Sequence, residues 1–260
     1  MIILLSPAKT FNSEEILKST PFEPTFKSQT GVLTRTLQKL DSEDLKNLMK
    51  VSDKIAKLNI DRYNHWETAK SFEALTAFGG TVYQALQAHT FSPQERQRAQ
   101  AQIRILSGLY GLIEPLRGIR PYRLEMGTKL RVDSMNNLYE FWGNTITDAL
   151  NQFTDTVVLN LASQEYSRVI NQKELSNVWV DIEFLVQKDA AWKNIGIISK
   201  KMRGLLARYI IIKNAKKIED LVSFSAEGFC FDAEYSTDTQ LIFKKEVSDK
   251  KKSSLNVFFV

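Results

Sequence analysis

The chain has 260 residues, 43% hydrophobic and 25% charged, which is enough to bury a full core as one large domain or two small ones and argues against disorder. The formal net charge is +5, and the one cysteine, Cys230, excludes an internal disulfide and fits the reducing cytoplasm. No run reaches the roughly 18 apolar residues of a membrane helix, so we expect no membrane partner.

The elements follow from apolar periodicity and from residues that start or stop helices. The first run, residues 2–6, predicts a strand because Ser6 and Pro7 end it too early for a signal peptide. Further along we expect helices at 42–50, 71–89, 93 to about 107 and 137–152, strands at 156–162, 178–186 and 195–199, a helix at 200–214 and a strand at 239–244.

Two helix starts are marked most clearly. Asp41 is a suitable N-cap for the helix at 42–50. Ser92, Pro93 and Glu95 form a capping box with proline at the first helical position, and we expect that helix to end at Gly108.

Strands that alternate with helices predict a mixed α/β fold, in which helices cover a mixed β-sheet. We expect a single compact domain over residues 1–245. Residues 246–260 are lysine-rich and then apolar, and we expect them to form a C-terminal tail or an added edge strand.

Residues 41–59 predict a helical hairpin. Its turn resembles that of a helix-hairpin-helix element, in which backbone N–H groups at a helix N-terminus bind a DNA phosphate. Lys50, Ser52 and Lys54 would hold the phosphate. Asp53 would put a negative charge beside it, and a plain helical hairpin is the alternative.

Basic residues concentrate in two segments. Residues 96–131 hold eight basic residues and two acids, and residues 193–217 hold eight basic residues and no acid. Residues 132–189 between them hold nine acids and three bases. This uneven distribution makes a polyanion the expected partner.

The second basic segment predicts a helix with Lys201 and Arg208 on one face and apolar residues on another. Gly204 lies between them. Because a glycine within a helix costs about 1 kcal/mol relative to alanine, we expect close approach of a phosphate or of a neighbouring element there. The segment would form a basic wall, although an ordinary solvated face is the alternative. The residues of this wall are Lys200, Lys201, Arg203 and Arg208, extended by Arg120 and Arg123.

Polar residues follow the predicted strands at 2–6 and 156–162. Since sites in α/β proteins lie at the carboxyl ends of strands, we expect a polar cleft that holds an anion or performs acid–base chemistry. The expected lining consists of Lys9, Ser107, Tyr110, Arg123, Glu125, Ser163, Glu165 and Tyr166.

Several common sites lack support in the sequence. Lys9 is not preceded by the glycines of a Walker motif, and neither a dinucleotide-binding fingerprint nor a nucleophile elbow occurs. The chain has only two histidines, His65 and His89, and we expect structural roles for both. We therefore expect no cofactor or metal.

Several blocks in collinear order resemble the YaaA family of peroxide stress resistance proteins. The most specific are SGLYGLIEPL at 107–116 and PYRLEMG at 121–127. The others are SPAKT at 6–10, SDK at 52–54, LYEFWG at 138–143, NLAS at 160–163 with Glu165 and Tyr166, Lys201 with RGL at 203–205, and EG at 227–228 with Phe231 and Asp232.

This resemblance implies a bacterial cytoplasmic protein that helps cells survive hydrogen peroxide by limiting free iron and so sparing DNA. It also implies a compact mixed α/β fold, a positively charged cleft, a helix-hairpin-helix element and binding to duplex or distorted DNA. The C-terminal tail departs from the family pattern.

Our leading hypothesis is sequence-tolerant binding of DNA through its phosphates, which requires the basic segments to converge on one groove. The competing hypothesis is an enzyme that acts on a nucleotide, nucleic acid or anionic metabolite in the polar cleft. Direct iron binding is a third hypothesis.

Overall fold

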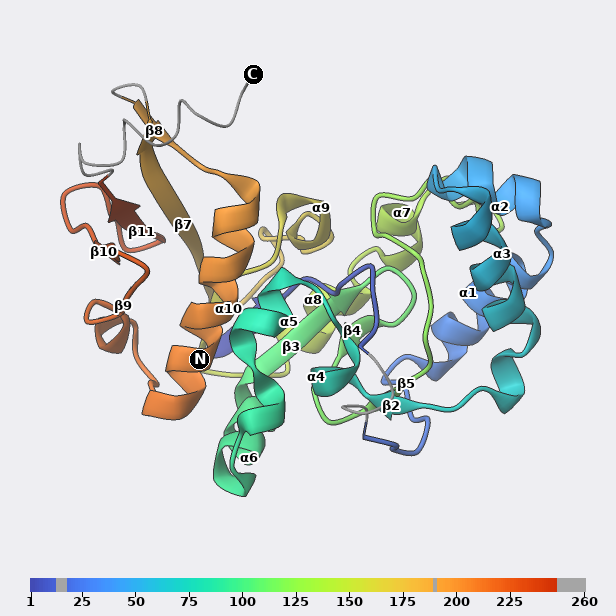
Figure 1. Ribbon diagram of the computed structural model, residues 1–260, viewed down its shortest axis with the longest axis horizontal. Helices are drawn as coiled ribbons and strands as arrows, with labels where there is room; N and C mark the ends of the chain where they lie inside the picture. The colour runs from blue at the N-terminus through green and yellow to red at the C-terminus, as the bar shows by residue number, and fades with distance from the viewer. Residues whose placement is uncertain (13–17, 189–190, 247–260) are drawn as a thin grey trace, which may run out of the picture.

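The computed structural model describes residues 1–12, 18–188 and 191–246 (Figure 1). Its main sheet has the order β4-β3-β1-β6-β7-β11-β10-β9, and β8 pairs with β7. The strands are β1 (Ile2–Leu5), β3 (Ile103–Ser107), β4 (Gly111–Ile113), β6 (Val157–Asn160), β7 (Val178–Lys188), β8 (Ala191–Lys193), β9 (Ser225–Ala226), β10 (Phe229–Phe231) and β11 (Gln240–Lys245).

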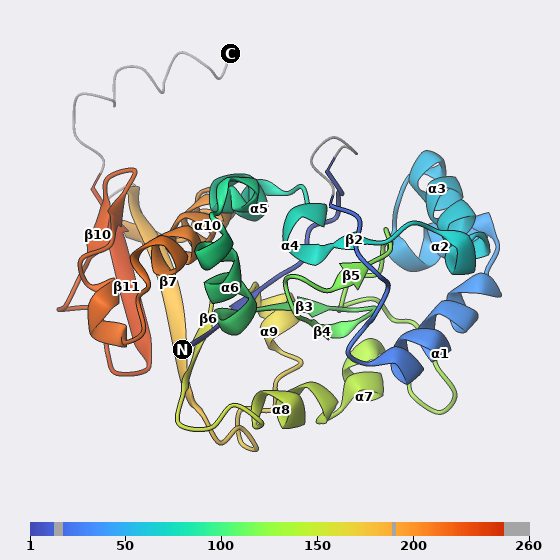
Figure 2. The ribbon, with the colours of Figure 1, turned by 90° about the horizontal axis from the view of Figure 1, so that it is seen from below.

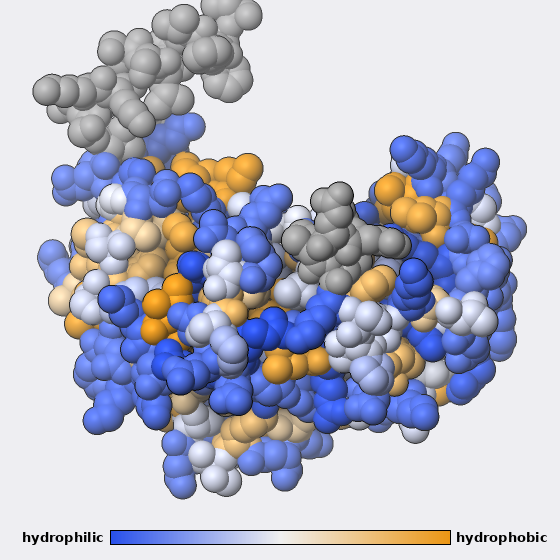
Figure 3. Space-filling model, turned by 60° about the horizontal axis from the view of Figure 1, so that its bottom comes forward, coloured by the Kyte–Doolittle hydropathy of each residue, from blue (hydrophilic) through white to orange (hydrophobic). Residues whose placement is uncertain are grey.

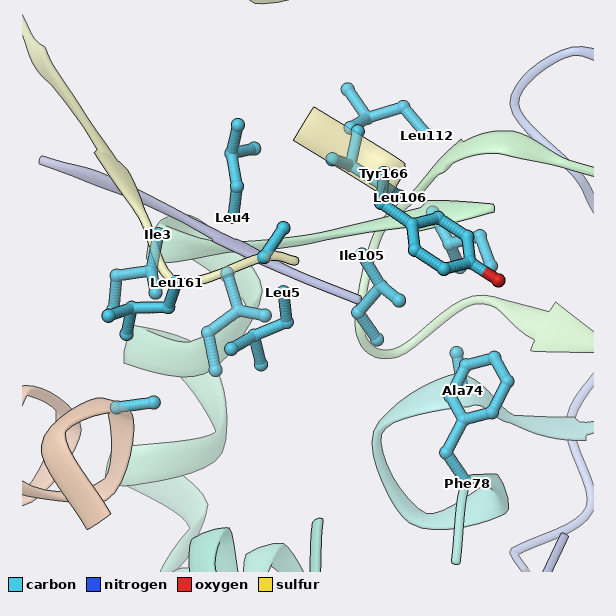
Figure 4. Close-up of a cluster of buried hydrophobic side chains, with 14 of the residues drawn as sticks. Ile3, Leu4, Leu5, Ala74, Phe78, Ile105, Leu106, Leu112, Leu161 and Tyr166 are labelled. Carbon is cyan, nitrogen blue, oxygen red and sulfur yellow. The ribbon is translucent and has the colours of Figure 1, made fainter. Parts of the chain in front are cut away.

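The middle of the sheet is parallel and its edges are antiparallel. β1 lies between β3 and β6, so that Ile3 is opposite both Ile103 and Leu159. All four residues of β1 are buried, as expected of a parallel strand covered on both faces. Their side chains alternate between the two sides of the strand and meet core residues such as Ile105 (Figure 4).

Helices cover both faces of the sheet: α5 and α10 lie on one, and α7 and α8 on the other (Figure 2). α1, α2 and α3 form a lobe at one end of the molecule. A small second sheet pairs β2 (Phe72–Glu73) with β5 (Gly118–Ile119). The helices are α1 (Lys27–Gln38), α2 (Ser42–Met49), α3 (Asp53–Asn64), α4 (Ala74–Ala77), α5 (Thr81–Leu86), α6 (Pro93–Gln102), α7 (Leu138–Trp142), α8 (Thr145–Leu150), α9 (Gln164–Ser167) and α10 (Gly196–Lys213).

The expected mixed α/β fold is confirmed, as are both marked helix starts. Asp41 accepts hydrogen bonds from the backbone N–H groups of Glu43 and Asp44, and Ser92 and Glu95 form the capping box of α6. Of the tail expected at 246–260, residues 247–260 lie outside the described part of the chain.

The expected ends of several elements are wrong. The helix from residue 93 ends at Gln102, and residues 103–107 form β3, because this segment fits between β1 and β4. The strand expected at 195–199 is instead the first turn of α10.

Two expected long helices are interrupted. The one at 71–89 is divided into β2, α4 and α5, with Gly79 and Gly80 between the helices. The one at 137–152 is divided into α7 and α8 at Gly143, which has a left-handed φ of 45°. Within the described ranges, no helix has the length and apolar character needed to cross a membrane.

Candidate functional site

A polar cleft of about 280 Å³ opens at the carboxyl ends of β1 and β6. One wall is the segment that follows β1, and the others come from α9, the start of α5 and α10. Of the residues expected in the cleft, four line it together with Lys200 and Arg203 of the basic wall. These four are Lys9, Ser163, Glu165 and Tyr166.

Two serines join the strand ends at the base of the cleft. Ser6 Oγ accepts a hydrogen bond from the Ser163 backbone N–H at 2.8 Å, and its hydroxyl lies 3.3 Å from Ser163 Oγ. Tyr83 of α5 donates from its hydroxyl to the Ser6 carbonyl at 2.8 Å. These bonds fix the position of Ser163, the N-cap of α9, beside the end of β1.

A carboxylate flanked by two cations lies beside the cleft. Glu125 Oε1 lies 3.2 Å from Lys9 Nζ and 2.8 Å from Arg123 Nη2. The carboxylate of Glu125 is only 12% exposed and the Arg123 side chain 17%, whereas the Lys9 side chain is 64% exposed. Lys9 is therefore the member of this triad that an entering anion meets first.

Glu165 and Tyr166 are held in place by their neighbours. Glu165 Oε1 accepts a hydrogen bond from the Gly127 backbone N–H at 3.1 Å, and its carbonyl accepts one from the Tyr139 hydroxyl at 2.8 Å. Burial raises the pKa of Tyr166 far above its usual range, so its hydroxyl stays protonated at neutral pH.

Ser107 and Tyr110 lie behind the cleft in the core, where both are almost wholly buried. Ser107 Oγ lies 2.6 Å from the Tyr122 hydroxyl and accepts backbone N–H bonds from Leu109 and Tyr110. The Tyr110 hydroxyl exchanges hydrogen bonds with the backbone of Arg120. Their hydroxyls support the segment that carries Arg123 and Glu125.

The hairpin consists of α2, a three-residue turn and α3. Lys50 is in the left-handed region with a φ of 51°, and Ser52 is the N-cap of α3 without a side-chain capping bond. Lys50, Ser52 and Lys54 are all exposed. Asp53 pairs with Lys46 at 2.8 Å, and this lysine lowers the pKa of Asp53.

α3 is attached to the segment beside the cleft. The buried Tyr63 donates a hydrogen bond from its hydroxyl to the Arg123 carbonyl at 2.8 Å. Burial raises the pKa of Tyr63 well above its usual range, which keeps the donor proton in place. The hairpin lobe is thus hydrogen-bonded to the segment beside the cleft.

Several cations of the expected basic wall have partners inside the protein. Lys201 pairs with Glu227 at 3.0 Å. Arg208 Nη1 donates to the Leu86 carbonyl at 3.0 Å and to Thr90 Oγ1 at 2.9 Å, so it holds the C-terminal end of α5. Lys200 is exposed at the cleft.

Most arginines of the first basic segment are also engaged. Arg120 stacks on Phe22, with 4.1 Å from its guanidinium carbon to the ring centroid, and donates to the Glu67 carbonyl at 3.0 Å. Arg96, Arg98, Arg104 and Arg117 bond to carboxylates or backbone carbonyls, whereas Lys129 and Arg131 are exposed.

The hairpin lies at one end of the molecule, whereas α10 lies towards the other end, beside β7 (Figures 1 and 2). Figure 3 shows a mostly hydrophilic surface that is hollowed between these two ends. The basic residues therefore do not form one compact patch.

Asp181 and Glu183 were missed as site residues at the sequence level. They alternate with buried residues along β7 and line a second cavity next to Arg203. Two carboxylates inside an otherwise apolar strand were the signal, because aspartate and glutamate are depleted in strands.

Neither histidine is buried. His65 lies 3.1 Å from the Asp61 carboxylate, and His89 is exposed. Cys230 is also exposed. Among the residues with described positions, no three His, Cys, Asp or Glu side chains group in a way that could hold a metal ion.

Comparison with known proteins gives consistent results. A family model described as "Peroxide stress protein YaaA" matches residues 1–235. A UPF0246 protein of Aliivibrio fischeri (strain MJ11) is 43% identical over 259 residues, which covers 96% of this chain and 100% of that protein. A UPF0246 protein of Shewanella sp. (strain ANA-3) is 42% identical over 255 residues, covering 95% and 99%.

Proposed function

Because the chain belongs to the peroxide stress protein YaaA family, we propose that it binds duplex or distorted DNA in the response to hydrogen peroxide. Binding would be through phosphates and tolerant of sequence. The protein would also help limit iron-dependent oxidative damage in the cytoplasm.

The hairpin turn supports this proposal most directly. Lys50 and Lys54 are exposed on either side of Ser52, and the Ser52 hydroxyl makes no capping bond. The turn thus offers two cations, a free hydroxyl and the positive end of a 12-residue helix to one phosphate. The negative charge of Asp53, which would repel a phosphate, is balanced by its ion pair with Lys46.

Further phosphate contacts would come from the cleft. Lys200 and Lys9 are its exposed cations, and both line the same cavity. A duplex that lies across the cleft would pass over them. If about five phosphates are neutralised, log affinity should fall with log salt at a slope of roughly −4 to −5.

Lys50→Gly tests the hairpin without damaging it. Glycine adopts the left-handed conformation freely, so the variant should be at least as stable as the wild type. It should nevertheless bind a DNA duplex more weakly, with a salt slope shallower by about 0.9. Fluorescence anisotropy across a salt series measures both quantities.

Lys213→Ala is the matched control. This exposed lysine at the C-terminal end of α10 carries the same charge as Lys50 but lies far from the hairpin. Its affinity for DNA should stay close to that of the wild type. If both variants lost the same affinity for DNA, the effect would come from net charge alone, and the hairpin assignment would be wrong.

A second candidate function is an enzyme that acts on an anionic metabolite or nucleotide in the cleft. The specific observation in its favour is the triad of Lys9, Glu125 and Arg123, since a mostly buried carboxylate between two cations is more than DNA binding requires.

Glu125→Gln separates the two candidates. If the cleft binds DNA, removal of this negative charge releases two cations, and affinity for DNA should rise. If Glu125 takes part in chemistry, the variant should bind DNA as before yet fail to restore peroxide survival in cells that lack the protein.

A further inference from the structure

The main sheet has a notch beside β7. Asp181 pairs with Asn160 of β6 on one edge and with Gln240 of β11 on the other. Val186 pairs with Lys193 of β8 and with Lys245 of β11. β6 and β8 therefore share one edge of β7, and along the described chain no strand pairs with residues 182–185 on that edge.

A cavity of about 960 Å³ lies at this notch. It is separate from the cleft, and α9 contributes residues to the lining of both. Arg203 of α10 also lines both cavities. The volume is within the range of roughly 300–1,000 Å³ that is typical of pockets for small molecules.

Arg203, one of the residues that line the notch, has a donor that no described residue fills. Its Nε is buried and has no hydrogen-bond partner among the described residues. Burial lowers the pKa of Arg203 while Glu183 and Asp181 oppose this effect, and a guanidinium stays charged at neutral pH. A buried N–H without an acceptor is costly, so an anionic group in the notch would relieve it.

The notch also presents acceptors. Asp181 and Glu183 are two residues apart on β7, so both side chains lie on one face of the strand. Asp181 Oδ1 already accepts a hydrogen bond from Asn160 Nδ2 at 2.7 Å, which holds it in place. Ionised carboxylates only accept hydrogen bonds, and sugar hydroxyls are donors that such carboxylates bind in nucleotide sites.

We propose that the notch binds a small phosphorylated sugar, such as the sugar phosphate of a nucleotide, with its phosphate on Arg203 and its hydroxyls on Asp181 and Glu183. A bare anion would be repelled by the two carboxylates, and an uncharged polyol would leave Arg203 unpaired. This proposal does not depend on DNA binding, because Lys9 and Lys200 line only the cleft, whereas Asp181 and Glu183 line only the notch.

Isothermal titration calorimetry with ribose 5-phosphate, ribose and inorganic phosphate tests it. Ribose 5-phosphate should bind about tenfold or more tightly than either fragment. In Arg203→Met its affinity should fall about 10- to 100-fold. In Glu183→Gln its affinity should also fall, while that for inorganic phosphate should stay the same or rise because a repelling charge is gone.

Lys213→Met is the control, since it removes a cation from the same helix outside the notch, and it should bind ribose 5-phosphate like the wild type. Should Arg203→Met fail to fold, Glu183→Gln still decides the matter, because its carboxylate accepts no hydrogen bond from the described residues. No heat from ribose 5-phosphate, or an affinity unchanged in Glu183→Gln, would overturn the proposal.

Discussion

Gly204 lies in the middle of α10 where this helix crosses α5. An added Cβ would come within 2.1 Å of the Val82 carbonyl oxygen and 2.8 Å of Ala85 Cβ. The neighbouring helix is thus the reason for a glycine at this position, which was one of the two reasons expected from the sequence.

Gly204→Ala should therefore destabilise the protein even though alanine is the better helix former by about 1 kcal/mol. Because Val82 contributes backbone atoms, α5 and α10 must separate to admit the methyl group, and overpacking of this kind costs about 1–3 kcal/mol. Urea unfolding measures the net change.

Gly196→Ala is the comparison, because a Cβ there would meet nothing within 4 Å. It should leave the unfolding free energy unchanged or raise it slightly. A Gly204→Ala variant as stable as Gly196→Ala would mean that the two helices are free to shift apart.

Single side chains of the candidate site were partly predictable. Lys9 and Ser163 follow strands, and they line the same cleft because the carboxyl ends of β1 and β6 are adjacent. The burial of Ser107 was not predictable, because its partner Tyr122 depends on how a loop folds back.

At the scale of elements, the hairpin offers a direct test of local capping. Asp41 accepts hydrogen bonds at 2.9 and 2.8 Å from the Glu43 and Asp44 N–H groups at the start of α2. Asp41→Ala should lower stability by about 1 kcal/mol, whereas Ser52→Ala should change it by only a few tenths, since Ser52 makes no such bond.

Hydrogen exchange of the α2 and α3 amides measures this difference. Faster exchange confined to α2 in Asp41→Ala is the expected result. Equal effects of the two substitutions would show that Ser52 caps α3 in solution.

Elements with local signals were predicted well and those made by tertiary contacts were not. α2 and α6 begin at their caps because a cap acts within one turn. β3 was mistaken for helix because residues 103–107 contain no helix breaker, and only the positions of β1 and β4 make them a strand. Ile197, by contrast, is 71% exposed in the first turn of α10, where its β-branched neighbours suggested a strand.

At the scale of the whole molecule, the positive surplus in the sequence is a poor guide to the free charge. Arginines such as Arg208 and Arg120 hold helices and loops together. Pairing between distant segments is invisible to a count along the chain, and for this reason the sequence could not show which basic residues stay free to bind a polyanion.

The protein should lose stability in acid. Hydrogen bonds and nearby lysines lower the pKa of several carboxyls that are exposed or half-buried, namely Asp53, Glu95, Glu140, Asp220, Glu227 and Asp232. The unfolded chain then binds protons more readily than the folded protein. Their contribution is complete above the unfolded pKa of about 4 and is lost as pH falls through the lower folded values.

Urea midpoints measured through this pH range should therefore fall towards acid. Glu140→Gln should flatten the dependence, because Glu140 accepts hydrogen bonds from the Asn136 backbone and the Asn137 side chain at 2.8 Å each. Glu219→Gln should not, since that exposed carboxylate accepts no hydrogen bond from the described residues. A pH profile identical in all three proteins would contradict the assignment.

The position of β1 has a kinetic consequence. Its partners Ile103 and Leu159 lie far along the chain, so the sheet cannot start from neighbouring segments and must close long loops before its central strand is paired. We expect slow refolding, with the caps and hairpin formed early and the sheet completed late. Until then the apolar residues of β1 stay exposed and can associate with other chains. The refolding yield should therefore fall as protein concentration rises.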